Sequence, residues 1–147
     1  AISSRLSKYR KYALLKYIGE NPLRGGLFVG LAIGAPHFLL PVEWSIAIAA
    51  LTLVFIAGIY VGFAIMNGRE KAFATETSVA VTFSLLGLGG LLFSAWFIPI
   101  GLVGHAIWDM IHHRKSHLLA EVPTWYIPFC IVIDVVLAVV LAISWIV

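Results

Sequence analysis

The feature that most constrains the fold is a series of five apolar segments, which take up most of a 147-residue chain. A helix needs about 20 predominantly apolar residues to cross a hydrocarbon core about 30 Å thick. Composition agrees, because 61% of residues are hydrophobic and only 12% are charged, whereas about a quarter are charged in soluble domains. We therefore expect an all-α protein of the cell membrane, an integral bundle of five transmembrane helices. The segments are residues 25–42, 44–66, 77–97, 98–111 and 124–147.

Pro99 divides the third apolar segment from the fourth. A continuous helix over residues 77–113 would be about 55 Å long at 1.5 Å per residue, nearly twice the thickness of the hydrocarbon core. Proline lacks a backbone donor and is well tolerated in the first turn of a helix. A turn near Pro99, followed by a separate fourth helix, is therefore predicted.

The basic residues predict the topology independently. All ten lie before the first segment, within residues 67–76 or within residues 112–123. These stretches share one side of a five-helix topology, whereas the opposite side contains Glu43 and no basic residue. Lys and Arg collect in cytoplasmic loops. The N-terminus is therefore predicted to be cytoplasmic and the C-terminus to be outside.

The chain divides into a basic segment, residues 1–23, and a single transmembrane domain, residues 24–147. We interpret the basic segment as a cytoplasmic amphipathic helix at the membrane interface. The alternative is an unstructured basic tail whose charges only reflect the excess of Lys and Arg on the cytoplasmic side. Apolar side chains recur in this segment at helical spacing, at Ile2, Leu6, Tyr9 and Ala13.

Small residues indicate where the helices pack. Glycines repeat at four-residue spacing in the first two apolar segments, and small residues let helix backbones approach closely in lipid. The tryptophans, including Trp108, lie mostly near segment ends and are interpreted as interfacial anchors. The glycines are Gly26, Gly30 and Gly34, then Gly58 and Gly62.

The pattern that carries chemistry is H-x-x-x-D-x-x-H-H, at the end of the fourth segment. At 100° per residue, its four side chains fall at about 0, 40, −20 and 80° around a helix, so they share one face. Imidazole nitrogens and a carboxylate suit zinc, iron or manganese. The pattern predicts a metal site that contains His105, Asp109, His112 and His113.

One helix rarely completes a metal site, so other segments must supply ligands. Asp134 lies ten residues after Thr124, deep in the last segment, where an unpaired carboxylate would be costly. Tyr126 and Cys130 precede it at helical spacing, and Cys130 is the only cysteine. Glu76 is predicted to begin the third helix, where the helix dipole favours a carboxylate. We predict Asp134 and Glu76 as further metal ligands, and His105, Asp109 and Asp134 as catalytic residues.

Each of these residues also has a structural interpretation. His112 and His113 lie beside Arg114 and Lys115, so a solvated basic rim explains them. Hydrogen-bonded pairs among the histidine and the two aspartates inside the membrane would hold helices together. His37 in the first segment is interpreted as a hydrogen-bonded packing residue.

Three motifs resemble those of a family of small bacterial multi-pass membrane proteins of unknown function. They are IYVGF with NGR at residues 59–69, GHxxWDxxHH at residues 104–113, and VPTWYxPFCxxxD at residues 122–134. The resemblance covers roughly residues 50–140. It implies that the motif positions belong together, and it implies no reaction. Asn67 stands where this pattern usually has an aspartate.

These observations predict a membrane-embedded, metal-dependent enzyme that acts on a lipid or other apolar substrate near the cytoplasmic side. The cofactor would be a divalent transition metal, zinc or iron. In a metal-free variant, His105 and Asp109 would be an acid/base pair for an isomerisation. The alternatives are an accessory or assembly subunit of a larger membrane complex, and a haem protein with His37 and His105 as axial ligands. Membrane lipids, a second copy or a larger complex are the expected partners, and nucleic acid is not.

Overall fold

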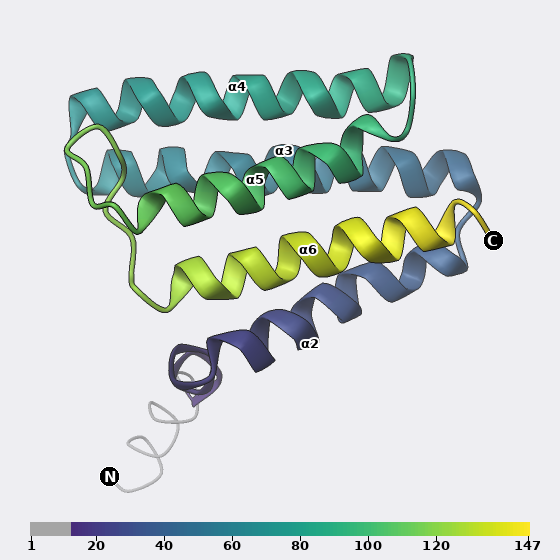
Figure 1. Ribbon diagram of the computed structural model, residues 1–147, viewed down its shortest axis with the longest axis horizontal. Helices are drawn as coiled ribbons and strands as arrows, with labels where there is room; N and C mark the ends of the chain where they lie inside the picture. Colours follow the sequence, from purple (N-terminus) through teal and green to yellow (C-terminus); the bar gives the residue numbers. More distant parts are fainter. Residues whose placement is uncertain (1–12) are drawn as a thin grey trace, which may run out of the picture.

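The chain folds into a bundle of antiparallel helices, shown in Figure 1. The structure is a computed structural model and describes residues 13–147. Within these residues it contains helices and no strand, which confirms the all-α prediction. The elements are α2 (Pro22–Gly34), the short 3-10 helix η1 (Ala35–Phe38), α3 (Val42–Met66), α4 (Glu70–Leu92), α5 (Phe97–His112) and α6 (Tyr126–Ser144).

Three helices, α3, α4 and α6, are long and apolar enough to cross a membrane. α5 is apolar but has 16 residues, and α2 has 13, both fewer than the roughly 20 that a full crossing needs. The fold is therefore a helical bundle with three membrane-capable helices, and not one with five full-length spans.

Prolines set several of the helix boundaries. Pro22 occupies the first turn of α2, and Pro41 immediately precedes α3. The predicted turn before the fourth segment is confirmed, because α4 ends at Leu92 and Pro99 lies in the first turn of α5. α4 begins at Glu70, seven residues earlier than predicted, since its first turns contain good helix formers. Glu76 consequently lies inside α4 and does not begin it.

α6 occupies the middle of the bundle. It packs extensively against α2 on one side and α5 on the other, while α4 packs against both α3 and α5 (Figure 1). The start of α2, the turn between α3 and α4, and the loop between α5 and α6 all lie at one end, which we call the basic end. It carries every basic residue that the structure describes, namely Lys16, Arg24, Arg69, Lys71, Arg114 and Lys115.

The basic N-terminal segment is described only in part. Residues 13–20 are helical, and Lys16 forms an exposed ion pair with Glu20 at 3.7 Å. Most of the amphipathic pattern, including Ile2, Leu6 and Tyr9, lies outside the described residues. The interfacial helix stays a prediction.

The glycines of α2 serve close packing on α6, as predicted. A Cβ atom at Gly26 would lie 2.6 Å from the backbone oxygen of Phe129, closer than real Cβ contacts. Side chains at Gly30 and Gly34 would meet valines of α6 at 3.0 and 2.9 Å. The two helix backbones can approach this closely only because these positions lack side chains.

The prediction for the glycines of α3 is wrong. A Cβ atom at Gly58 or Gly62 would have no neighbour within 4 Å. This face of α3 points away from the bundle, and the neighbouring Phe55 and Ile65 are 72% and 63% exposed. Four-residue spacing signals that a close approach is possible, but not that a neighbouring helix of the same chain uses it.

Candidate functional site

His105 and Asp109 of α5 and Asp134 of α6 meet in the interior of the bundle, and we call them the buried triad. Each side chain is at most 1% exposed. His105 and Asp109 are one helical turn apart, so their side chains lie on the same face of α5. The predicted shared face of His105 and Asp109 on one helix is therefore confirmed, and Asp134 is buried beside them.

The distances within the buried triad are short. His105 Nδ1 lies 2.8 Å from Asp134 Oδ2 and 3.6 Å from Asp109 Oδ1. One potential ligand atom from each residue lies within 4.8 Å of the other two. Two atoms bound at about 2.1 Å to one ion are at most about 4.2 Å apart, and both distances from His105 Nδ1 lie within this limit. The group could therefore hold a metal ion.

The buried triad also has unused polar atoms. His105 Nε2, Asp109 Oδ2 and Asp134 Oδ1 are buried and have no hydrogen-bond partner in the protein. In the part of the chain that the structure describes, only the Thr77 hydroxyl shares this property. Buried polar atoms are nearly always paired, and an unpaired one costs about 1–3 kcal/mol. Three such atoms in one cluster indicate a set of ligand-binding atoms. A purely structural hydrogen-bonded pair would leave fewer polar atoms without a partner.

Tyr60 of α3 belongs to this site, although sequence reasoning did not select it. Its hydroxyl donates a 2.6 Å hydrogen bond to Asp109 Oδ1, and the residue is 1% exposed. Tyr60 is not a member of the buried triad, but its hydrogen bond orients the Asp109 carboxylate. Residues that hydrogen-bond to metal ligands commonly have this role. The sequence signal that could have identified Tyr60 is a tyrosine in the middle of an apolar helix. A buried tyrosine hydroxyl usually has a hydrogen-bond partner.

Glu76 and His112 form a separate cluster. Glu76 Oε1 accepts hydrogen bonds from the Ala120 backbone N–H at 2.9 Å and from His112 Nε2 at 2.8 Å. Glu76 Oε2 accepts one from the Trp108 indole at 3.1 Å. The other ring nitrogen of His112 lies 3.0 Å from the Trp108 carbonyl oxygen. Trp108 is therefore half-buried and bonded within the bundle, not simply an interfacial anchor.

The prediction that His112, His113 and Glu76 share a site with the buried triad is therefore corrected. His112 is seven residues after His105, or about 10 Å further along the helix axis, too far to reach the same ion. Both of its ring nitrogens already have partners. His113 is exposed at the end of α5 and faces the α5–α6 loop. The angular positions of residues around a helix show that they share a face, but not that they lie at the same position along the helix axis.

His37 lies at the opposite end of the bundle from the α5–α6 loop. Its Nδ1 is 2.7 Å from the hydroxyl of Ser45, which also accepts a 2.8 Å hydrogen bond from the Trp145 indole. His37 is thus a buried packing residue that ties η1 to the start of α3. The structure does not bring His37 and His105 together as two axial ligands of a haem.

An apolar cavity of about 220 Å³ reaches the buried triad from the side of the bundle. Residues of α2, α3 and α6 line it, among them Phe55, Cys130 and Asp134. Asp134 is the only charged residue in this lining. Cys130 and Tyr126 are buried beside it, so the predicted stripe of Tyr126, Cys130 and Asp134 does face the interior.

Comparisons with family models, with curated proteins and with solved structures gave no match. The resemblance to a family of small bacterial membrane proteins therefore stays a prediction. Any function has to be argued from the residues themselves.

Proposed function

We propose that this protein is a membrane-embedded, metal-dependent enzyme that acts on a lipid or other apolar substrate. The observation that carries the proposal is the buried triad, which has three unpartnered polar atoms and one member, Asp134, in the lining of an apolar cavity. We further propose that the basic end lies at the cytoplasmic face. The clustering of the described basic residues at that end supports this orientation.

The donor set favours a transition metal. One imidazole nitrogen and two carboxylate oxygens suit zinc or iron, and sites with three protein ligands leave a position for substrate or water. Histidine and carboxylate ligands must be deprotonated to bind a metal, so metal affinity would depend on pH. The metal, when bound, would activate water or oxygen, or polarise a substrate oxygen.

The apolar cavity indicates how a substrate reaches Asp134. It is smaller than the roughly 300–1,000 Å³ of pockets that enclose a drug-sized ligand, so it fits part of a single hydrocarbon chain. Its lining includes Phe55 of α3 and Ile33 of α2, both exposed on the surface of the bundle. An apolar substrate could therefore enter sideways from the lipid.

The geometry also bears on the metal-free variant. His105 lies closer to Asp134 than to Asp109, so the acid/base pair would be His105 with Asp134. Asp109 is engaged by the Tyr60 hydroxyl. Metal content separates the two mechanisms, because the metal-free enzyme would retain activity in the presence of a chelator.

The first prediction concerns metal content. Purified wild-type protein should contain close to one transition-metal ion per chain by mass spectrometry, and His105→Ala should contain almost none, because a third of the donor set is removed. His113→Ala is the matched control and should keep its metal, since His113 is exposed and outside the buried triad. Equal metal loss in both variants would contradict the assignment.

The second prediction concerns Tyr60. Tyr60→Phe should weaken metal binding by roughly 10–100-fold, because Asp109 loses the hydrogen bond that orients it. The measurement is a competition titration with a chelator of known affinity. Tyr126→Phe is the control, since Tyr126 packs against the Tyr60 ring without bonding to the buried triad. An unchanged affinity in Tyr60→Phe would remove Tyr60 from the site.

The exposed face of α3 favours a second candidate function, that of an accessory subunit in a larger membrane complex. Within residues 13–147, a Cβ atom at Gly58 or Gly62 would have no neighbour within 4 Å, and such faces suit close packing of another transmembrane helix. Native solubilisation separates the candidates. A protein that runs alone and carries metal supports the enzyme, whereas stoichiometric co-purification with larger subunits and no intrinsic metal supports the accessory role.

A further inference from the structure

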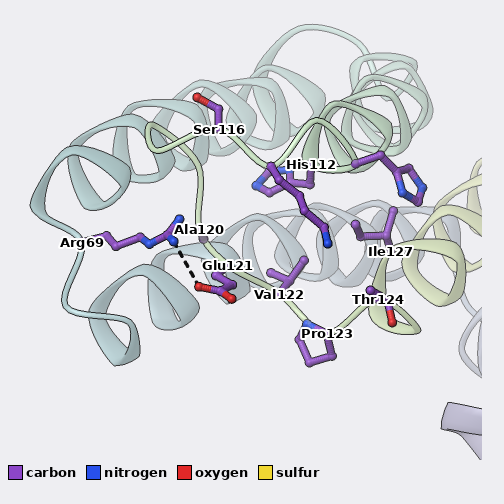
Figure 2. Close-up of a pocket in the computed structure, with 11 residues that line it drawn as sticks. Arg69, His112, Ser116, Ala120, Glu121, Val122, Pro123, Thr124 and Ile127 are labelled. Atoms are coloured by element: carbon purple, nitrogen blue, oxygen red, sulfur yellow. Dashed lines mark hydrogen bonds and ion pairs between the residues drawn. The ribbon is translucent and has the colours of Figure 1, made fainter.

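A second cavity, of about 350 Å³, opens at the basic end, and we call it the rim pocket (Figure 2). It lies between the turn that joins α3 to α4 and the loop that joins α5 to α6. Arg69 lies beside Glu121, and the loop residues Val122 to Thr124 continue the lining (Figure 2). The buried triad does not line this pocket.

Positive charge predominates in the rim pocket. Arg69 and Lys115 line it, and Glu121 is the only carboxylate in the lining. Glu121 Oε2 lies 3.1 Å from Arg69 Nη2, the pair joined by a dashed line in Figure 2. Within residues 13–147, Lys115 forms no ion pair. The pocket therefore has cationic groups in excess of its carboxylate, which suits an anion.

The rim pocket is built on a fixed loop. The Asn67 side-chain oxygen accepts a 2.8 Å hydrogen bond from the Glu121 N–H, and Glu76 accepts one from the Ala120 N–H. The Arg69 guanidinium also reaches the Leu119 carbonyl oxygen at 3.4 Å. These contacts tie the α5–α6 loop to the start of α4, so the Arg69 guanidinium is positioned before a ligand binds.

The position of the rim pocket identifies the kind of anion. α3 ends at Met66, α5 ends at His112 and α6 begins at Tyr126, so the pocket lies where the apolar helices stop. Lipid headgroups lie at this depth, and basic pockets between transmembrane helices bind anionic headgroups. The apolar residues Val122, Pro123 and Ile127 complete the lining, as an amphiphilic ligand requires.

We propose that the rim pocket binds the phosphate group of a membrane lipid. Arginine and lysine suit this role, since a guanidinium can contact two phosphate oxygens at once and an ammonium adds a point charge. His112 also lines the pocket, and its ring stacks on Tyr60 with centroids 4.2 Å apart. His112 and Tyr60 would thus lie between a bound headgroup and Asp109 of the buried triad. The membrane setting rests on the proposed function, but the headgroup site does not require the metal.

The test is native mass spectrometry of the detergent-solubilised full chain, titrated with phosphatidic acid or with diacylglycerol of the same acyl chains. We expect phosphatidic acid to bind at least tenfold more tightly. Arg69→Gln and Lys115→Gln should each weaken its binding roughly fivefold, the effect of one cation near a membrane surface. Glu121→Gln should bind equally or more tightly, because it removes the carboxylate that repels phosphate and engages Arg69.

Two controls keep the result decisive. Arg114→Gln removes a neighbouring charge outside the pocket and should bind phosphatidic acid as the wild type does. His105→Ala should also retain this binding, so that failure of the metal centre and failure of the headgroup site are distinguishable. Equal binding of diacylglycerol, or equal losses in Arg114→Gln and Lys115→Gln, would overturn the proposal. Binding of inorganic phosphate without phosphatidic acid would overturn the assignment to a lipid.

Discussion

Replacing Glu76 with alanine is expected to lower the free energy of unfolding by about 3 kcal/mol or more, because three hydrogen-bonding groups lose their buried partner at once. Glu76 is 1% exposed and accepts hydrogen bonds from His112, Trp108 and the Ala120 backbone. Without its carboxylate, groups from α5 and from the α5–α6 loop lose their partner together. The carboxylate thus links three segments of the chain at one point.

This expectation can be checked by unfolding in mixed micelles with increasing sodium dodecyl sulfate. Glu70→Ala is the matched control, because Glu70 is an exposed carboxylate in the first turn of the same helix. It should change stability by no more than about 0.5 kcal/mol. A loss below about 1 kcal/mol in Glu76→Ala would mean that the cluster contributes little net stability, as some buried ion pairs do.

Replacing Gly26 with leucine is expected to cost about 3 kcal/mol or more, the upper range for overpacking. Even a Cβ atom there would lie 2.6 Å from a backbone oxygen of α6, and a helix backbone cannot yield as a side chain can. α2 would have to move away from α6 along its length. The same unfolding measurement, with tryptophan fluorescence as the signal, reports the loss.

Gly58→Leu is the control for this variant. Gly58 has no neighbour within 4 Å, so a leucine should leave the stability of the single chain unchanged or raise it by up to about 1 kcal/mol through helix propensity. Equal destabilisation by Gly26→Leu and Gly58→Leu would contradict the described packing of α2 on α6. A Gly58→Leu variant that folds normally but no longer co-purifies with a partner would favour the accessory role.

Hydropathy and two prolines were sufficient to predict most of the fold. Helices form in all five apolar segments, and the turn before Pro99 follows from a length argument alone. The sequence did not predict which helices pack together, because glycine spacing alone cannot identify the helix that packs against a small-residue face. Gly26 and Gly58 have the same spacing pattern and opposite environments. Helix ends near charged residues were also misplaced, because propensity extended α4 back to Glu70.

The buried triad was predictable because deep ionisable residues are costly unless they meet a partner. The same reasoning could not separate it from His112, since periodicity gives an angle around α5 and not a distance along it. The sequence did not predict the role of Tyr60, because a single tyrosine in an apolar helix cannot be distinguished by sequence pattern from any other buried aromatic residue. Its role depends on α3 and α5 lying side by side, and no local sequence signal contains that information.

The position of α6 between α2 and α5 has a consequence for biosynthesis. The main packing partner of α2 is the last helix of the chain, which begins about 90 residues after α2 ends. At roughly 5–20 residues per second, the ribosome needs about 5–20 s to make the intervening chain. During that interval the glycine face of α2 has no partner in the nascent protein. α2 therefore reaches its main native neighbour only after α6 has been made.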